Sequence, residues 1–196
     1  MKISQTQQRA LIRLFTASNW KQRLGALLIV LIGAWACVQQ EAVTPGKLSA
    51  GSVIEGKVVG VADGDTVTVL DQDNRQYKLR LAYIDSPEKA MPFGQAAKKS
   101  LSDLVYGSQI SAAIDDVDRY GRGVARISKN EQDINLQQVK AGMAWHYTHY
   151  TKTQSRSDYA QYQAAQEAAR SGQIGLWQDQ NPTPPWDWRK ANRNNK

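Results

Sequence analysis

The chain has 196 residues, which is enough for a leader and one compact domain but too short for a second full domain. Its single cysteine, Cys37, excludes an intramolecular disulfide framework. No Cys and His spacing matches a zinc site, so any bound metal needs oxygen ligands.

The formal net charge is +7, but the first 38 residues supply five positive charges and no acid. The remainder carries 20 basic and 18 acidic side chains, so phosphate recognition must come from a few placed basic residues.

An uninterrupted apolar stretch of 15 residues runs from Leu24 to Val38, after a basic lead-in and before polar residues. This pattern predicts an N-terminal hydrophobic export or anchor segment, with the N-terminus in the cytoplasm and the body outside it. Three fates of the segment stay open. Ala34-Trp35-Ala36 has the small-x-small pattern of a signal-peptidase site, Cys37 is a candidate for lipid modification, and the long basic lead-in suits an uncleaved anchor. We therefore expect a protein of the cell envelope or a secreted protein.

The composition divides the chain into four predicted parts. Residues 1–38 are the signal peptide or membrane anchor, and residues 39–51, broken by Pro45 and Gly46, are a linker. Residues 52–180 are the folded body. Residues 181–196 hold three prolines and two tryptophans without a helical period, which predicts a strap or tail.

Short β-branched runs and helical patterns alternate in the body. The predicted strands are Val53–Val61, Thr66–Leu70, Gln76–Ile84, Gln109–Ile114 and Gly123–Ile127. The predicted helices are Gly94–Val105, Ile134–Ala141 with Asp133 as its cap, and Ser157–Gly172. This order predicts an α+β protein, and a five-stranded β-barrel of the oligonucleotide-binding (OB-fold) type with three helices is one architecture that fits it.

Two acidic clusters lie at predicted strand ends. Asp63-Gly64-Asp65-Thr66 lies between the first two strands, and Asp85-Ser86-Pro87-Glu88 follows the third. Neighbouring strand ends can bring Asp65 and Asp85 together, and two facing carboxylates favour a hard cation between them. Taken singly, each cluster is more simply a turn, because Asp, Gly, Ser and Pro are common turn residues.

Two arginines accompany these clusters. Arg80 lies on the third predicted strand, and Arg122 lies in a glycine-bounded turn before the fifth. The guanidinium fork matches phosphate oxygens bidentately. For either arginine alone, a surface salt bridge is the simpler interpretation.

The motifs taken together resemble the staphylococcal nuclease (thermonuclease) family, in its exported bacterial form. The resemblance rests on Asp63-Gly64-Asp65-Thr66, Arg80-Leu81, Ile84-Asp85-Ser86-Pro87-Glu88, Asp118-Arg119-Tyr120-Gly121-Arg122-Gly123 and Gly175-Leu176-Trp177. The motifs follow the family order with near-family spacing across residues 52–180. The ending Pro184-Pro185-Trp186-Asp187-Trp188-Arg189-Lys190 also resembles those of exported members.

The resemblance implies a role for each motif residue. The implied metal is Ca²⁺, with Asp65 and Asp85 as carboxylate ligands and Ser86 as a backbone carbonyl ligand. Glu88 would position or deprotonate the attacking water, so its replacement should lower the rate more than binding. Arg80 and Arg122 would clamp the scissile phosphate, where fixed charge stabilises the transition state.

A substrate platform is expected beside these residues. Arg119 is a candidate for a second phosphate, and Tyr120 and Tyr150 are candidates for stacking on a base. Tyr packing at the barrel mouth is an equally good alternative. His146 and His149 are expected to have packing or surface roles, because the family chemistry does not require them.

The sequence therefore predicts a calcium-dependent endonuclease that hydrolyses DNA and RNA with little base specificity and leaves 3'-phosphate ends. Single- and double-stranded DNA and RNA are its expected partners, with the membrane added if the leader is uncleaved. No obligate protein partner is expected, and a monomer is the default. The alternatives are a catalytically inactive OB-fold nucleic-acid-binding module tethered to the membrane, which the intact set of motif residues argues against, and a structural or adhesion role.

Overall fold

The chain divides at Val43 into two units, residues 1–43 and residues 44–196. The computed structural model describes residues 5, 6, 8, 9, 12, 20–38, 43–149 and 154–193. In the first unit, α2 (Trp20–Val38) is a helix of 19 residues that contains the whole predicted apolar stretch. Across the described ranges, no helix is long and apolar enough to cross a membrane.

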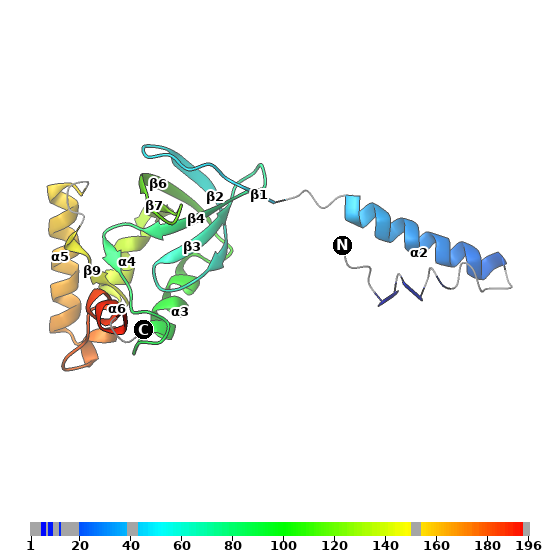
Figure 1. The fold of residues 1–196 in the computed structure, drawn as a ribbon. Coiled ribbons are helices and arrows are strands. Elements are labelled where there is room, and N and C mark those ends of the chain that lie inside the picture. The colour runs from blue at the N-terminus through cyan, green and yellow to red at the C-terminus, as the bar shows by residue number, and fades with distance from the viewer. Residues whose placement is uncertain are drawn as a thin grey trace. The chain divides into compact units, whose positions relative to one another are not determined.

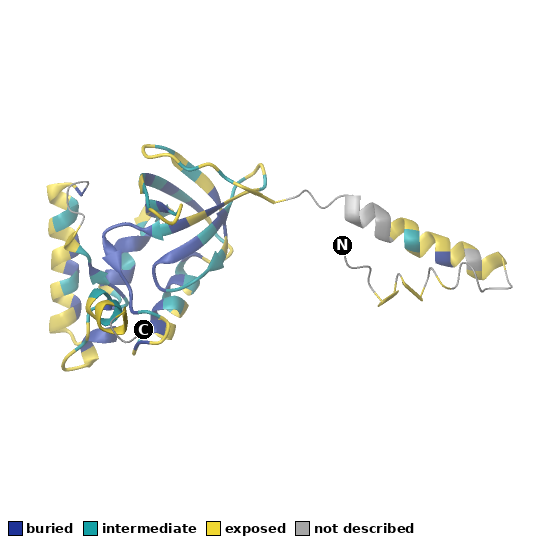
Figure 2. Ribbon diagram, viewed as in Figure 1, coloured by how far each residue is buried: buried dark blue, intermediate teal, exposed yellow. Residues whose placement is uncertain are grey.

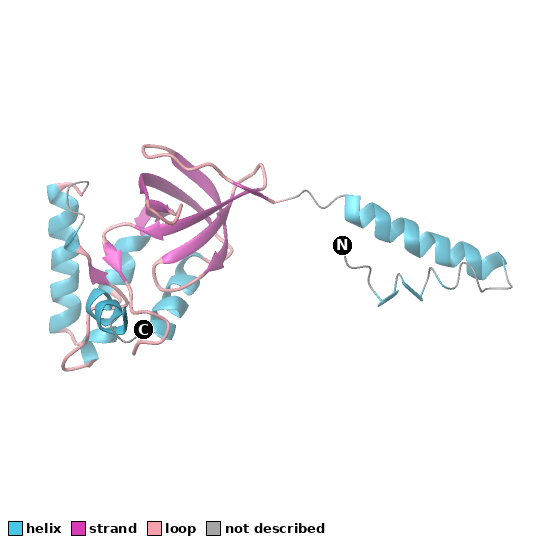
Figure 3. Ribbon diagram, in the orientation of Figure 1, coloured by secondary structure: helices cyan, strands magenta, loops and turns pink. Residues whose placement is uncertain are grey.

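A closed barrel of five strands forms the body of the second unit (Figures 1 and 3). The strands are β2 (Val53–Val61), β3 (Thr66–Leu70), β4 (Arg75–Leu81), β6 (Gln109–Val117) and β7 (Gly123–Lys129). They pair antiparallel in the order β4-β3-β2-β6-β7, and a parallel pairing of β4 with β7 closes the ring. The predicted α+β class with a five-stranded barrel is therefore confirmed.

Four short strands extend or flank the barrel. β1 (Thr44–Pro45) lies parallel to β4, and β8 (Gln132–Asp133) forms a hairpin with β7. β5 (Ile84–Asp85) pairs instead with β9 (Trp145–His146) in a separate two-stranded sheet. The prediction of one continuous strand from Gln76 to Ile84 was wrong, because Tyr83 takes a left-handed conformation (φ 64°) that turns the chain away from the barrel.

The described residues after Val43 include four α-helices and the 3-10 helix η2. They are α3 (Gly94–Val105), α4 (Ile134–Lys140), α5 (Arg156–Ser171), the 3-10 helix η2 (Gly175–Gln178) and α6 (Pro185–Arg193). Asp133 caps α4 as expected, since its side chain accepts the N–H of Leu136. The three predicted helices are present as α3, α4 and α5, but the expectation of a tail without a helix was wrong. The Pro184 carbonyl accepts the N–H groups of Asp187 and Trp188, and this opens α6.

The barrel interior is the main hydrophobic core (Figure 2). Its fully buried strand residues take alternating positions, as in Val67 and Val69 or Leu79 and Leu81, and helices α3 and α4 add others such as Leu101. A smaller cluster of Ala169, Leu176 and Trp177 packs with Phe93 and Trp145. The second cluster therefore joins the start of α3 to η2 and β9, outside the barrel.

Two fully buried polar side chains on α4 connect the barrel to its surroundings. Asn135 Nδ2 donates to the carbonyls of Ala82 (3.0 Å) and Ala125 (2.9 Å), so it links the residue after β4 to β7, the two strands that close the barrel. Gln138 Nε2 donates to the carbonyls of Gly64 (2.8 Å) and Ala97 (3.1 Å). Through these bonds α4 fixes both the closing strands and the acidic turn after β2.

Candidate active site

The acidic turn between β2 and β3 is held by short-range hydrogen bonds from its own side chains. Asp63 Oδ1 accepts the N–H of Asp65 at 3.1 Å, and Asp65 Oδ1 accepts the hydroxyl of Thr66 at 3.0 Å. A Cβ at Gly64 would lie 2.7 Å from the Cβ atoms of both Ser86 and Ala97, so only glycine fits there. The turn therefore packs directly on the segment after β5 and on α3.

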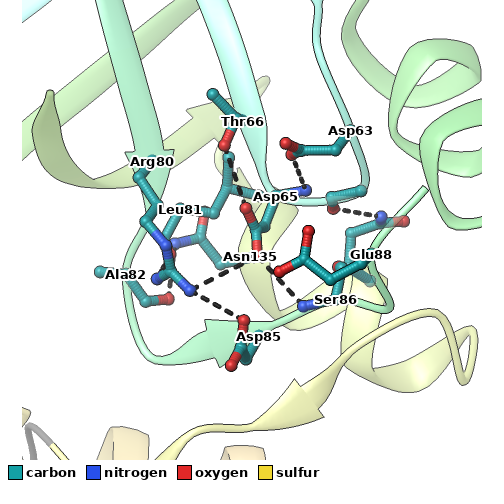
Figure 4. Close-up of polar contacts among 12 residues, drawn as sticks. Asp63, Asp65, Thr66, Arg80, Leu81, Ala82, Asp85, Ser86, Glu88 and Asn135 are labelled. Atoms are coloured by element: carbon teal, nitrogen blue, oxygen red, sulfur yellow. Dashed lines mark hydrogen bonds and ion pairs between the residues drawn. The ribbon is translucent and has the colours of Figure 1, made fainter. Parts of the chain in front are cut away.

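The predicted approach of the two acidic clusters is present in the structure (Figure 4). Asp65 Oδ2 accepts the N–H of Ser86 at 3.1 Å, and Arg80 Nη2 lies 3.5 Å from Asp65 Oδ2 and 3.0 Å from Asp85 Oδ1. Arg80 is directed there by the register of β4, where it pairs with Thr66 of β3. One guanidinium thus bridges two carboxylates from different chain segments.

Burial of these charged side chains shifts their pKa values. Asp85 is 1% exposed, and its burial, together with the charge of Asp65, raises its pKa above the ordinary value, although hydrogen bonds from Arg189 oppose the shift. Burial would lower the pKa of Arg80, but Asp65 and Asp85 raise it overall. Burial and the charge of Asp65 also raise the pKa of Asp63. The site accordingly favours additional positive charge.

Glu88 lies at the mouth of this group. Its carbonyl accepts the N–H of Met91 at 2.8 Å, and a Cβ at Gly94 would lie 2.0 Å from the same carbonyl oxygen. The tight turn into α3 therefore fixes the backbone of Glu88. Its carboxylate Oε1 accepts a hydrogen bond from Arg189 Nη1 at 2.8 Å.

Arg122 belongs to a separate turn, between β6 and β7. Its Nε donates to Asp118 Oδ2 at 2.7 Å, and its backbone N–H donates to Asp118 Oδ1 at 2.9 Å. Val124, two residues later, pairs with Arg80 across the parallel β4–β7 contact. Arg80 therefore lies on β4 and Arg122 in the turn just before its neighbour β7. Arg122 pairs with Asp118, and Arg80 pairs with the acidic group.

The predicted substrate platform is partly described. Tyr120 is 69% exposed, and the guanidinium groups of Arg119 and Arg122 lie 4.9 and 5.5 Å from its ring centroid. Tyr150 lies outside the described residues.

The two histidines have different surroundings. His146 is buried, its Nε2 lies 3.1 Å from Gln154 Oε1, and burial lowers its pKa. His149 is exposed, and its ring stacks on Tyr147. Burial against other rings gives His146 a packing role, as expected for this residue.

The oxygen donors of the site bear on the calcium ion that the sequence resemblance implies. No group of three or more Cys, His, Asp or Glu side chains suited to a metal is found in the described part of the chain. Two buried carboxylates, Asp65 and Asp85, do converge, and the buried Ser86 hydroxyl has no hydrogen-bond partner. Oxygen donors of this kind suit a hard cation, which keeps several waters as further ligands.

Comparison with known proteins decides the family. Residues 78–179, just over half of the chain, match the family model described as "Staphylococcal nuclease homologue". The chain belongs to the staphylococcal nuclease family. Its enzyme class is that of a nuclease, a hydrolase of phosphodiester bonds.

Relatives in several bacteria support this assignment. An "Uncharacterized endonuclease" of Haemophilus influenzae is 45% identical over 139 residues, which cover 71% of the chain and 75% of that protein. A "Micrococcal nuclease" of Shigella flexneri is 36% identical over 178 residues, covering 86% and 90% of the two chains. "Protein ParB" of Escherichia coli is 31% identical over 180 residues, covering 87% and 90%.

Three side chains of this nuclease were missed as site residues by sequence reasoning. Asn135 and Gln138 looked like ordinary polar positions of a helix, and only the long-range bonds of the fold give them a role. Arg189 could have been suspected, because it follows two tryptophans in a proline-rich segment. The catalytic and metal-binding roles of the residues that were named remain predictions.

Proposed function

We propose that this nuclease is a calcium-dependent endonuclease that cleaves DNA and RNA with little base specificity and leaves 3'-phosphate ends. The observation that supports it most directly is the bridge from Arg80 to Asp65 and Asp85 beside the carboxylate of Glu88. A guanidinium, two buried carboxylates and a partly exposed glutamate form the set that metal-assisted phosphodiester hydrolysis needs.

The residues that would hold calcium are Asp65 and Asp85 through their carboxylates and Ser86 through its backbone carbonyl. Bound calcium supplies positive charge against a phosphate oxygen and makes a nearby water more acidic. Positive charge would also relieve the repulsion between Asp65 and Asp85, which contributes to the raised pKa of Asp85.

The protein side chains perform the remaining tasks. Glu88 accepts the proton of the attacking water on its carboxylate, since it is the more exposed acid of the group, with 35% of its side chain exposed against 1% for Asp85. Arg80 donates to a non-bridging phosphate oxygen from a position already fixed by β4. Arg122, in the turn just before β7, stabilises charge on the leaving oxygen.

Low base specificity is consistent with the exposed turn that carries Tyr120. A tyrosine ring stacks on any base, because every base has a π-face, and Arg119 beside it reads a phosphate rather than a base edge. Tyr150 is proposed as a second stacking residue on sequence grounds alone.

The decisive experiment measures cleavage by the full-length protein. Single-stranded DNA, double-stranded DNA and RNA, each labelled at the 5' end, are incubated in calcium and in chelator. Glu88→Gln is compared with Glu55→Gln, a matched change at an exposed position of β2. We expect cleavage only in calcium, a rate reduced at least about 100-fold in Glu88→Gln alone, and products whose mobility shifts after phosphatase removes a 3'-phosphate.

A different outcome would favour the binding module. If the wild-type protein retains all three nucleic acids in a mobility-shift assay but leaves them intact in calcium, the catalytic proposal is wrong. Products without a terminal phosphate at the 3' end would overturn the proposed bond specificity while leaving the nuclease in place.

We further propose that residues 1–38 direct export of a monomeric nuclease, as a cleaved signal peptide or a retained anchor. The support is the acid-free basic lead-in before Leu24–Val38. Cell fractionation and the mass of the mature protein test this proposal. Recovery of the full-length chain in the cytoplasm alone would contradict it, and light scattering would report the oligomeric state.

A further inference from the structure

Arg189 of α6 binds the same carboxylates that the proposed chemistry uses. Its Nη2 lies 2.6 Å from Asp85 Oδ2, and its Nη1 lies 3.2 Å from Asp85 Oδ1 and 2.8 Å from Glu88 Oε1. Arg80 already donates to Asp85 Oδ1 at 3.0 Å. Both oxygens of Asp85 and one oxygen of Glu88 are therefore engaged by guanidinium groups.

The segment that carries Arg189 packs on the rim of the site through aromatic side chains. Trp186 contacts the rings of Trp145 and Tyr147, with centroid distances of 5.7 and 5.3 Å, which places α6 beside β9 (Figure 1). Pro185 is buried at the first position of the helix, where its fixed φ favours helix formation. This packing gives α6 a defined seat from which Arg189 reaches the carboxylates.

The packing beneath α6 is incomplete. Trp188 lines a cavity of about 80 Å³ together with Pro87, Met91 and Phe93. Arg189 itself is 40% exposed, and the residues from Lys190 to Arg193 are exposed. The helix α6 is short, lies over a cavity and has an exposed outer face, so it makes few buried apolar contacts. Segments of this kind can open locally.

A divalent cation and the Arg189 guanidinium need the same oxygens. A metal that takes a carboxylate oxygen of Asp85 at 2.3–2.6 Å, the usual distance for calcium, competes with Arg189, which donates to both oxygens of that carboxylate, whereas Arg80 donates to one. The Glu88 oxygen that accepts a hydrogen bond from Arg189 is also less available to accept a proton from a water. While Arg189 is bound, it hinders both metal binding by Asp85 and proton transfer from water to Glu88.

We propose that α6 is an intramolecular competitor of the divalent cation, in which Arg189 occupies Asp85 and Glu88 until the cation displaces it. The proposal rests on the proposed function, since it concerns the regulation of that same site. Competition of this kind lowers the apparent affinity for the cation, because only molecules in which Arg189 has left the carboxylates can bind it. If α6 is seated in nine molecules out of ten, the apparent Kd for calcium is raised about tenfold.

The test measures calcium binding by titration calorimetry on the full-length protein, without substrate. Arg189→Gln removes the charged fork, and Lys190→Ala is the matched control, because it removes one positive charge from the exposed neighbouring position of the same helix. We expect about tenfold tighter calcium binding by Arg189→Gln and wild-type affinity in Lys190→Ala. Arg189→Lys, which keeps the charge without the bidentate fork, should lie between the two.

Hydrogen exchange of residues 185–193 gives a second readout in the wild-type protein. Saturating calcium should speed exchange of these amides, while the strands of the barrel keep their protection. Equal or weaker calcium binding by Arg189→Gln, or unchanged exchange in α6, would overturn the inference and leave the proposed function intact. If none of the proteins binds calcium, both the proposed function and this inference are wrong.

Discussion

Asp118 holds Arg122 through both of its carboxylate oxygens, with Oδ2 accepting from the side-chain Nε and Oδ1 from the backbone N–H. Oδ1 also accepts the N–H of Tyr120 at 2.9 Å. Burial alone would raise the pKa of Asp118, but the N–H and the guanidinium of Arg122 lower it below its ordinary value. A single ionised side chain therefore orders the turn and aims its arginine.

Replacement of Asp118 should impair catalysis more than folding. In Asp118→Ala the guanidinium of Arg122 loses its orientation, and misplacement of such a group costs about 10- to 100-fold in kcat/KM. The measurement is steady-state cleavage of a short labelled oligonucleotide. Asp73→Ala serves as the control, since Asp73 pairs with Arg75 in an exposed turn away from the site. Wild-type kcat/KM in Asp118→Ala would show that the pairing is not needed.

The glycine of the acidic turn gives a second prediction. Gly64→Ala places a methyl group 2.7 Å from two Cβ atoms, of Ser86 and Ala97, which cannot rotate away. The turn or the segment after β5 must shift, so we expect at least about a 10-fold loss of kcat/KM, because catalytic groups displaced by 1 Å lose about 100-fold. Gly60→Ala is the matched control, as its methyl group would meet Thr68 at an ordinary 3.4 Å. Equal activity of the two variants would contradict this account.

Alanine variants of Asn135 and Gln138 should show different effects on stability and on activity. Either side chain replaced by alanine leaves buried backbone groups without partners, at a cost of about 3 kcal/mol in the free energy of unfolding. Asn135→Ala removes hydrogen bonds to the strands that close the barrel. Gln138→Ala instead removes the hydrogen bond to the Gly64 carbonyl of the acidic turn.

We therefore expect similar losses in denaturant unfolding for the two variants, and a fall in activity per folded molecule in Gln138→Ala alone. The activity should be measured well below the unfolding midpoint of both proteins, so that the folded fraction is the same. A comparable fall in Asn135→Ala would show that the two roles are not separable.

The β3–β4 turn predicts a pH dependence of stability. Desolvation would raise the pKa of Asp71, but the N–H and guanidinium of Arg75 and the hydroxyl of Tyr77 lower it to about 2. Because the folded-state pKa is below the ordinary 3.8, the carboxylate stabilises the fold above that value. This contribution is lost as the pH falls from about 4 to about 2.

Thermal unfolding measured between pH 2 and pH 7 tests this sign. Asp71→Asn should unfold at a lower temperature than the wild type at pH 7, and the difference should shrink toward pH 2. A difference that is constant over the whole range would mean that ionisation of Asp71 does not contribute.

The sequence predicts the bounds of individual strands and helices better than it predicts the pairing of segments that are far apart in the chain. Val53–Val61, Thr66–Leu70 and Gly94–Val105 were predicted with their observed bounds, because turn residues and glycines mark their ends. The approach of Asp65 to Asp85 also followed from their places at strand ends. The pairing of β5 with β9 could not be predicted, since it joins two-residue strands that carry no periodic pattern.

The C-terminal segment was misjudged for a related physical reason. Residues 181–196 contain prolines that usually end helices, and Pro185 instead occupies the first helical position, where its missing N–H costs nothing. Whether Arg189 reaches Asp85 depends on how Trp186 packs on Trp145, a contact between distant parts of the chain. Local propensity has no information about such contacts.

The parallel contact between β4 and β7 has a consequence for the order in which the molecule folds. It joins Leu79, Arg80 and Leu81 to residues 123–125, and the chain between them contains β5, α3 and β6. Contacts between distant residues are reached late, because the entropy of closing the intervening loop is lost first. Since Arg80 lies on this contact, the nuclease should acquire activity only in the last step of refolding, after the antiparallel strands are already protected.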